Sequence, residues 1–241
     1  MSNGFWPLVV GAYLLGSVPA AYLAARRSCG IDIREYGSGN VGASNLLRLT
    51  SKRTAIPVII FDSVKGMVMV VVAWRLGLGV TEQLVVGIAA ISGHNWPVFL
   101  RFKGGRGVIT TMGVAFLLPI INGLVPPETS FLTTVGYGSI AILSAYFKRL
   151  PVGVFIIVAL FPLVTWGLTG LLPLTLGYLA MFLVFTIRRL TASQPVSITS
   201  ISKKQVLLNR LLFDRDIKDK AAWMSLVLEQ EKQRRLARSN K

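Results

Sequence analysis

Long runs of apolar residues alternate along the chain with short polar and basic segments. A bilayer core is crossed by about 20 helical residues, with a lower limit of about 17. Seven runs approach or exceed this length, and we expect each to form a membrane helix: 5–25, 55–74, 80–93, 108–125, 131–147, 151–168 and 171–187. The third run and several later ones are short, so we expect them to tilt little or to be partly re-entrant. The pattern predicts an all-α, polytopic membrane protein of about seven transmembrane helices, with its membrane-embedded domain over residues 1–190.

The basic residues test this count, because loops that face the cytoplasm hold an excess of Lys and Arg. Of the 26 Lys and Arg residues, 24 lie between the first and second runs, the third and fourth, the fifth and sixth, or after the seventh. This alternation predicts an N-terminus outside the cell and a cytoplasmic C-terminus. The net charge of +16 would indicate nucleic-acid binding in a protein without apolar runs. Since the cations flank apolar runs, we expect them to meet anionic membrane lipids, and we expect no nucleic-acid partner.

The composition changes after residue 190. Residues 191–202 are rich in Ser and Thr and are expected to form a linker, whereas 203–241 mix apolar clusters with many cations. Helices that lie on the inner leaflet use both kinds of residue, and a solvated basic tail is the alternative. Residues 191–241 are therefore predicted to be a basic cytoplasmic tail.

Two glycine-rich polar segments, 37–45 and 93–107, fall on the predicted cytoplasmic side. In the second, three glycines leave backbone N–H groups available to one anion, and two cations add positive charge. These residues are Lys103, Gly104, Gly105, Arg106 and Gly107. The apolar run that follows places the anion at a helix N-terminus. One such segment alone could be a solvated positive loop, but two on one membrane face, the first followed by Arg48, predict a shared pocket for a cytosolic phosphate.

Two charged residues and the only histidine lie in or beside apolar runs. Asp62 and Lys65 are three residues apart and so share a helical face. A charge at mid-bilayer costs about 2.5–3.5 kcal/mol on insertion scales, so we expect a structural ion pair, or a Lys65 that lines the inner end of the phosphate pocket. His94 either makes interfacial hydrogen bonds or handles a proton near neutral pH, and the sequence places no carboxylate next to it. One His and one Cys, Cys29, cannot build an ordinary zinc site, so we expect no metal and no cofactor.

A phosphate pocket of this kind fits an enzyme, a transporter of small anions, or a protein that binds phosphorylated headgroups. A transporter needs polar groups near mid-membrane from later helices, and the fourth to seventh runs contain no charged residue. The cations of both segments can neutralise two phosphates held close together, one on each reactant. This arrangement favours group transfer.

A family resemblance rests on three stretches: Gly37-Ser38-Gly39-Asn40-x-Gly42-Ala43-x-Asn45 with Arg48, Asp62-x-x-Lys65-Gly66, and Gly93-His94-x-x-Pro97-x-Phe99-Leu100-x-Phe102-Lys103-Gly104-Gly105-Arg106-Gly107-Val108. They resemble the first motifs of the bacterial acyl-phosphate-dependent glycerol-3-phosphate acyltransferases, over roughly residues 5–190. The resemblance implies a multi-pass enzyme of the bacterial inner (plasma) membrane. It would move a fatty acyl group from acyl phosphate to the sn-1 hydroxyl of glycerol 3-phosphate, giving lysophosphatidic acid and phosphate. Its partners would be these substrates, membrane lipids and, through a functional link, an enzyme that produces acyl phosphate.

The residue pattern and the resemblance together assign roles within the pocket. His94, Ser38 and Arg48 are expected to be catalytic. The residues expected to bind substrate are Asn40, Asn45, Lys65, Lys103, Gly104, Gly105 and Arg106.

Toward the C-terminus the chain departs from the family's pattern. Leu183 and Thr186 stand where the family has a His and an Asn of its active site, and Gly136 aligns best with a family serine. The chain would then depend on His94 and Thr186 for turnover. The alternative is a catalytically impaired paralogue that binds phosphorylated lipid precursors.

Overall fold

The computed structural model describes residues 4–192 and 201–239. Within them the chain forms eleven α-helices and two short 3-10 helices, without strands, which confirms the predicted all-α class. In chain order these are α1 (Phe5–Ser17), α2 (Ala20–Cys29), η1 (Ile33–Glu35), α3 (Ala43–Leu49), α4 (Lys52–Arg75), α5 (Val80–Asn95), η2 (Val98–Leu100), α6 (Val108–Ile121), α7 (Pro127–Tyr146), α8 (Leu150–Thr169), α9 (Leu172–Thr191), α10 (Lys203–Phe213) and α11 (Lys220–Ser239). The predicted linker at 191–202 lies mostly outside the described residues.

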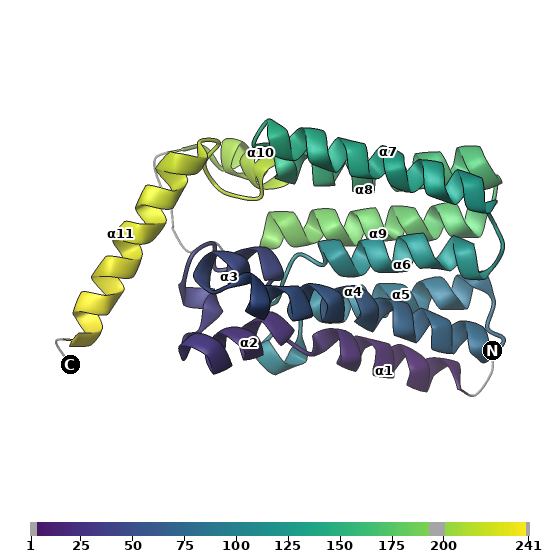
Figure 1. The fold of residues 1–241 in the computed structure, drawn as a ribbon, viewed down its shortest axis with the longest axis horizontal. Helices are drawn as coiled ribbons and strands as arrows, with labels where there is room; N and C mark the ends of the chain where they lie inside the picture. Colours follow the sequence, from purple (N-terminus) through teal and green to yellow (C-terminus); the bar gives the residue numbers. More distant parts are fainter. Residues whose placement is uncertain (1–3, 193–200, 240–241) are drawn as a thin grey trace.

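Helices α1 and α4 to α9 run side by side along the long axis of the molecule (Figure 1). Each predicted apolar run falls mainly on one of these helices. Among the described residues, four apolar stretches are long enough to cross a membrane, and Val108–Ile121 is a shorter apolar helix. The four are Phe5–Cys29, Lys52–Arg75, Leu150–Thr169 and Leu172–Thr191. These stretches support a membrane protein, while the count of seven spans and the orientation of the termini remain predictions.

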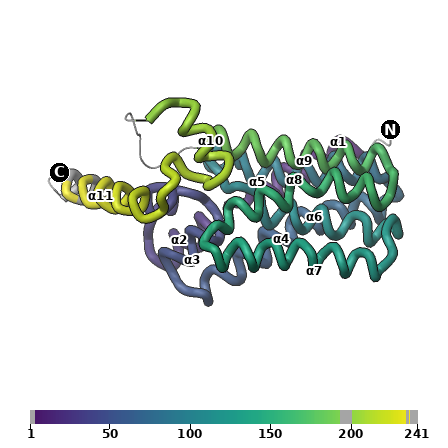
Figure 2. Tube along the Cα trace, turned by 90° about the horizontal axis from the view of Figure 1, so that it is seen from above, coloured from purple at the N-terminus to yellow at the C-terminus, as the bar shows by residue number. Residues whose placement is uncertain are grey.

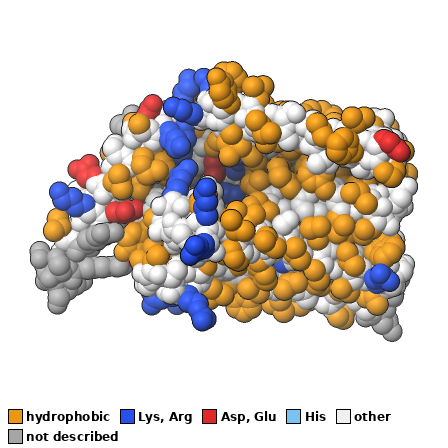
Figure 3. All heavy atoms as spheres, viewed as in Figure 1, with side chains coloured by type: hydrophobic (Ala, Val, Ile, Leu, Met, Phe, Trp, Pro, Cys, Tyr) orange, Lys and Arg blue, Asp and Glu red, His pale blue; other side chains and the backbone are white. Residues whose placement is uncertain are grey.

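On the face shown in Figure 3, hydrophobic side chains cover most of the bundle, and Lys and Arg gather toward the end where α2, α3 and α10 lie (Figure 1). Many large apolar side chains are exposed on the long helices. Examples are Ile60, Phe131, Ile142, Leu163 and Leu176. Lipid tails solvate such a surface as well as a protein core does. We therefore expect water-soluble reactants to reach the molecule at its basic end.

Glycines allow α1 and α5 to touch along their backbones. A Cβ at Gly16 would overlap the carbonyl of Ala90, and one at Gly93 would overlap that of Tyr13. Small residues permit this close approach between membrane helices. The contact fixes the end of α5, where His94 lies, against α1.

Two hydrophobic clusters hold the bundle and its basic end. The larger joins α4, α5, α6, α8 and α9 through residues such as Val70, Ile91, Val114, Ile157 and Phe185. The smaller joins α2, η1, α3, α4 and η2 through Ala25, Ile33, Leu46, Ala55 and Leu100. The smaller cluster lies beneath the first glycine-rich segment and anchors it to the bundle.

The described part of the tail, residues 201–239, forms two helices, α10 and α11. Helix α10 packs against α8 and α9, and α11 leads away past α2 and α3 (Figures 1 and 2). The turn between α10 and α11 is closed by a small cluster around Trp223 and Val227. The placement of these helices on a membrane leaflet, and the alternative of a solvated tail, remain predictions.

Candidate active site

A cavity of about 320 Å³ lies where the two glycine-rich segments meet. Its wall includes Ser38, Asn40, Arg48, His94 and Arg106. These residues come from the loop before α3, from α3 itself, from the end of α5 and from the loop before α6. The convergence of the two segments on one space agrees with the sequence-based expectation.

Asn45 stabilises the conformation of the first glycine-rich segment through hydrogen bonds to its backbone. Its Oδ1 accepts the N–H of Ser38 at 2.9 Å, and its Nδ2 donates to the carbonyls of Ile33, Tyr36 and Asn40 at 3.3, 3.0 and 3.2 Å. The side chain is 1% exposed and is not among the residues that line the cavity. Its amide is engaged within the loop, so the geometry gives Asn45 the task of positioning Ser38 and Asn40.

A short turn, η1, leads into this segment. The Asp32 carboxylate accepts the N–H of Arg34 at 3.0 Å and pairs with its guanidinium at 2.6 Å. Although partial burial opposes it, the hydrogen bond from the Arg34 side chain holds the pKa of Asp32 below its usual range. The turn ends before Gly37, whose φ of +57° lies in the left-handed region and where a Cβ would overlap Asn45 Oδ1.

Arg188 of α9 fixes the second segment. Its Nε and Nη2 donate to the carbonyls of Gly105 and Gly104, both at 2.7 Å. The N–H of Gly105 donates to the carbonyl of His94 at 3.1 Å. The expectation that this N–H would be available to an anion is therefore wrong, because it is used inside the protein.

Helix α6 begins where the second segment ends. Its N-cap, Gly107, has φ +67°, and a Cβ there would overlap Asn95 Oδ1. Gly107, Val108 and Ile109 line the cavity. The first turn of α6 is thus part of the cavity wall, and a helix N-terminus attracts anions through its dipole and its amides.

A buried charged group connects α4 to α5. Lys65 Nζ donates to Asp62 Oδ1 at 2.8 Å, which is the expected ion pair, and His94 Nδ1 lies 3.5 Å from the same oxygen. The expectation that no carboxylate neighbours His94 is therefore wrong, because helix packing brings Asp62 to it. Asp62 and His94 line the cavity, and Lys65 lines a neighbouring void of about 10 Å³. The Nε2 side of His94 faces Gly105, where a Cβ would overlap it.

The two cations of the second segment differ in position. Arg106 is 6% exposed, lines the cavity and donates from Nε to Asp214 Oδ1 at 2.6 Å. Lys103 is exposed and is not among the lining residues. The loop before it turns through positive φ at Arg101 and Phe102, 53° and 61°. The structure therefore brings Arg106 to Ser38 and Arg48 in the cavity and leaves Lys103 outside.

Sequence reasoning did not assign the arginines at the end of α9 to the site. Arg188 positions the glycine segment, and Arg189 lines the cavity. Arg189 also donates to the carbonyls of Leu211 and Pro151 at 2.6 and 2.7 Å. In the sequence these arginines are a pair of cations at the end of an apolar run. Such a pair is equally typical of a membrane helix that ends among lipid headgroups, so it did not indicate a site.

The positions that depart from the family pattern lie elsewhere. Leu183 is 50% exposed, and neither it nor Thr186 is among the cavity-lining residues. A Cβ at Gly136, on α7, would meet nothing within 4 Å. Thr186 therefore contributes no group to this wall.

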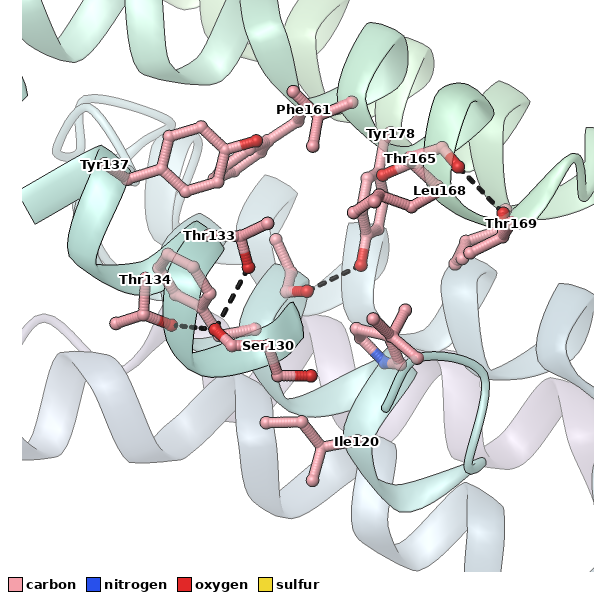
Figure 4. A pocket seen from close by; sticks show the side chains of 16 residues that line it. Ile120, Ser130, Thr133, Thr134, Tyr137, Phe161, Thr165, Leu168, Thr169 and Tyr178 are labelled. Carbon is pink, nitrogen blue, oxygen red and sulfur yellow. Dashed lines mark hydrogen bonds between the residues drawn. The ribbon is translucent and has the colours of Figure 1, made fainter. Parts of the chain in front are cut away.

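A second hollow of about 50 Å³ lies among α6, α7, α8 and α9 (Figure 4). Its lining includes no charged residue. Several of its hydroxyls donate to backbone carbonyls: Thr133 and Thr134 to Ser130, Thr169 to Thr165, and Tyr178 to Ala115.

Within the described part of the chain, no three His, Cys, Asp or Glu side chains are grouped to hold a metal ion. The charged cavity is thus the candidate for chemistry on phosphates.

Comparisons with known proteins give matches over most of the chain. The family model described as glycerol-3-phosphate acyltransferase matches residues 6–194. The chain is 39% identical over 231 residues to glycerol-3-phosphate acyltransferase 5 of Dehalococcoides mccartyi, covering 93% of this chain and 94% of the relative.

Two solved structures are similar to this one. Both are of PlsY (YgiH), an integral membrane glycerol 3-phosphate acyltransferase. Its glycerol 3-phosphate form has a TM-score of 0.67 and 25% identity, covering 78% of this chain and 88% of that one. Its lysophosphatidic acid form has a TM-score of 0.67 and 24% identity, covering 94% and 99%, and shows the shared fold. From the family match and the Dehalococcoides relative, the chain belongs to the glycerol-3-phosphate acyltransferase family.

Proposed function

We propose that this chain transfers a fatty acyl group from acyl phosphate to the sn-1 hydroxyl of glycerol 3-phosphate, at the cytoplasmic face of the plasma membrane. The observation that carries the proposal is the single cavity lined by Ser38, Arg48, His94, Arg106 and the first turn of α6. PlsY was solved in a glycerol 3-phosphate form and in a lysophosphatidic acid form, which supports this substrate and this product here. The alternatives of an impaired paralogue and an anion transporter gain no support from family membership.

The cavity provides for both reactants. Arg48 and Arg106, with the N-terminus of α6, would neutralise the phosphate groups. Leu150, Pro151 and Val154 of α8 add an apolar side to the wall, where the start of an acyl chain would lie. Holding two reactants in one orientation supplies much of the rate enhancement when the leaving group is already good.

In the proposed step, the sn-1 hydroxyl oxygen bonds to the carbonyl carbon of acyl phosphate. The bond from that carbon to the phosphate oxygen breaks, and inorganic phosphate leaves with the electron pair. The hydroxyl proton passes to His94 Nε2, while Asp62 on the Nδ1 side orients the imidazole. Asp62 acts through His94 and is thus a positioning residue.

The donor has consequences for the cell. Acyl phosphate is a reactive mixed anhydride, so a separate enzyme must produce it close to the membrane. The basic end of the bundle would bind both this donor and glycerol 3-phosphate from the cytosol.

The test is an acyl-transfer assay on purified protein in lipid, with palmitoyl phosphate and labelled glycerol 3-phosphate. Lysophosphatidic acid should form, and Arg48→Ala should raise KM for glycerol 3-phosphate about tenfold or more, since a charge-assisted contact contributes about 1.5–3 kcal/mol. Arg53→Ala is the matched control, because Arg53 is exposed and not among the lining residues. Binding without product would instead identify an impaired paralogue. An unchanged KM would remove Arg48 from the site.

A further inference from the structure

The C-terminal tail forms one side of the cavity although it lies outside the family match, which ends at residue 194. The end of α10, the following turn and the start of α11 contribute to the wall. The residues are Phe213, Asp214, Arg215, Lys220 and Trp223. The tail is therefore in a position to take part in binding.

The turn that carries these residues is firmly held. Arg210 pairs with Asp216 at 2.5 Å and donates to the carbonyl of Leu190 at 3.1 Å. Asn209, 3% exposed, donates to the carbonyl of Asp216 at 2.8 Å. Since Arg189 also donates to the carbonyl of Leu211 at 2.6 Å, two hydrogen bonds tie the end of α10, just before the turn, to α9.

Two tail carboxylates contact the two glycine-rich segments. Asp214 accepts from Arg106 Nε at 2.6 Å, and Glu231 of α11 accepts the N–H of Gly37 at 2.6 Å. A carboxylate and a phosphate oxygen use the same donors. A phosphate group that binds Arg106 Nε or the Gly37 N–H therefore competes with a carboxylate of the protein's own tail.

Two buried donors on the same wall lack partners. Arg189 Nε and Trp223 Nε1 have no hydrogen-bond partner, and their residues are 3% exposed and line the cavity. A buried donor left unpaired costs about 1–3 kcal/mol, so an acceptor that reached either nitrogen would recover that cost. Arg215 and Lys220 bring further positive charge to this side.

We propose that the tail completes the phosphate-binding site of this chain, with Trp223 and Arg189 as donors to a substrate phosphate and with Asp214 and Glu231 as internal anions that the substrate replaces. This inference rests on the proposed function only for the identity of the phosphorylated ligand. It predicts effects of opposite sign for residues of the same tail. A tail that only stabilised the fold would give effects of one sign.

The experiment measures equilibrium binding of labelled glycerol 3-phosphate, and separately of inorganic phosphate, to the full chain in lipid nanodiscs. Asp214→Asn and Glu231→Gln keep the side-chain shape and remove the competing charge. If a carboxylate holds its segment in about nine of ten molecules, its removal tightens the apparent Kd about tenfold. Trp223→Phe keeps an aromatic side chain, although a smaller one, and removes the donor, and should weaken binding about threefold or more. Glu229→Gln, an exposed position of α11, is the matched control and should bind as the wild type.

The inference is overturned if Asp214→Asn and Glu231→Gln bind as the wild type does, or bind more weakly together with Trp223→Phe. Thermal midpoints of the variants show whether each one is folded. Acyl transfer is scored separately, so lysophosphatidic acid formation with unaltered binding in these variants refutes the role of the tail and leaves the enzyme activity standing. Opposite shifts in binding without any product refute the activity and leave the role of the tail standing.

Discussion

Replacing Asp62 with asparagine removes the carboxylate that lies between Lys65 and His94. The Lys65 side chain is 1% exposed and its Nζ lies 2.8 Å from Asp62 Oδ1. Loss of one partner from a buried ion pair costs about 3–5 kcal/mol, because the other charge stays buried without compensation. For a chain of this size, about 1 kcal/mol corresponds to about 2–4 °C, so Asp62→Asn should lower the thermal midpoint by about 6–20 °C.

A double variant separates stability from catalysis. Asp62→Asn with Lys65→Met removes both charges, and replacement of a buried pair by uncharged groups is often neutral or stabilising. We therefore expect a thermal midpoint near that of the wild type. His94 would still lack the carboxylate on its Nδ1 side, so kcat should fall about a hundredfold, the lower end of what a positioned general base contributes, with little change in KM.

The assays are loss of helical circular dichroism on heating and acyl transfer in lipid. Lys65→Met alone keeps the Asp62 to His94 contact and controls for the loss of the lysine. Wild-type kcat in the double variant would refute the orienting role of Asp62. An undisturbed thermal midpoint in Asp62→Asn would refute the buried ion pair.

Three further predictions concern the loops. Gly105→Ala should abolish most activity because the new Cβ would overlap the His94 ring, whereas Gly136→Ala, with open space around it, should be silent in the same transfer assay. Asn45→Ala should raise KM for glycerol 3-phosphate and speed limited proteolysis of the first loop, since the Ser38 N–H and three carbonyls lose their partner. The pKa of Asp32 is lower in the folded state than in the unfolded state. The ionised Asp32 carboxylate therefore stabilises the fold above its unfolded-state pKa, and this contribution is lost as the pH falls through its folded-state pKa. The difference in thermal midpoint between wild type and Asp32→Asn should thus vanish in acid.

Much of the helical framework was predictable from hydropathy alone. Apolar runs near the length of a bilayer crossing leave the backbone few other structures, so the long helices fall where the runs are. Pairing of Asp62 with Lys65 was also predictable, because a spacing of three places both on one helical face.

The meeting of the two glycine-rich segments was expected, but the individual side-chain contacts between distant segments were not predictable. The approach of Asp62 to His94 depends on how α4 and α5 pack, and the clamp of Arg188 on Gly104 and Gly105 depends on where α9 ends. Lys103 and Arg106 looked equivalent in sequence, but the local turn leaves Lys103 exposed and buries Arg106. The spacing of Lys103 and Arg106 in the sequence does not indicate which of the two side chains is buried.

The central claim is that both glycine-rich segments bind a phosphorylated substrate in one cavity. Binding of labelled glycerol 3-phosphate to Arg106→Gln and Lys103→Gln in nanodiscs tests it most directly, because the two variants remove one charge each from the same loop. The account predicts at least tenfold weaker binding for Arg106→Gln, the loss of about 1.5 kcal/mol or more from a charged contact, and binding within about twofold of wild type for Lys103→Gln. Wild-type affinity in Arg106→Gln together with a large loss in Lys103→Gln would contradict the cavity as the site.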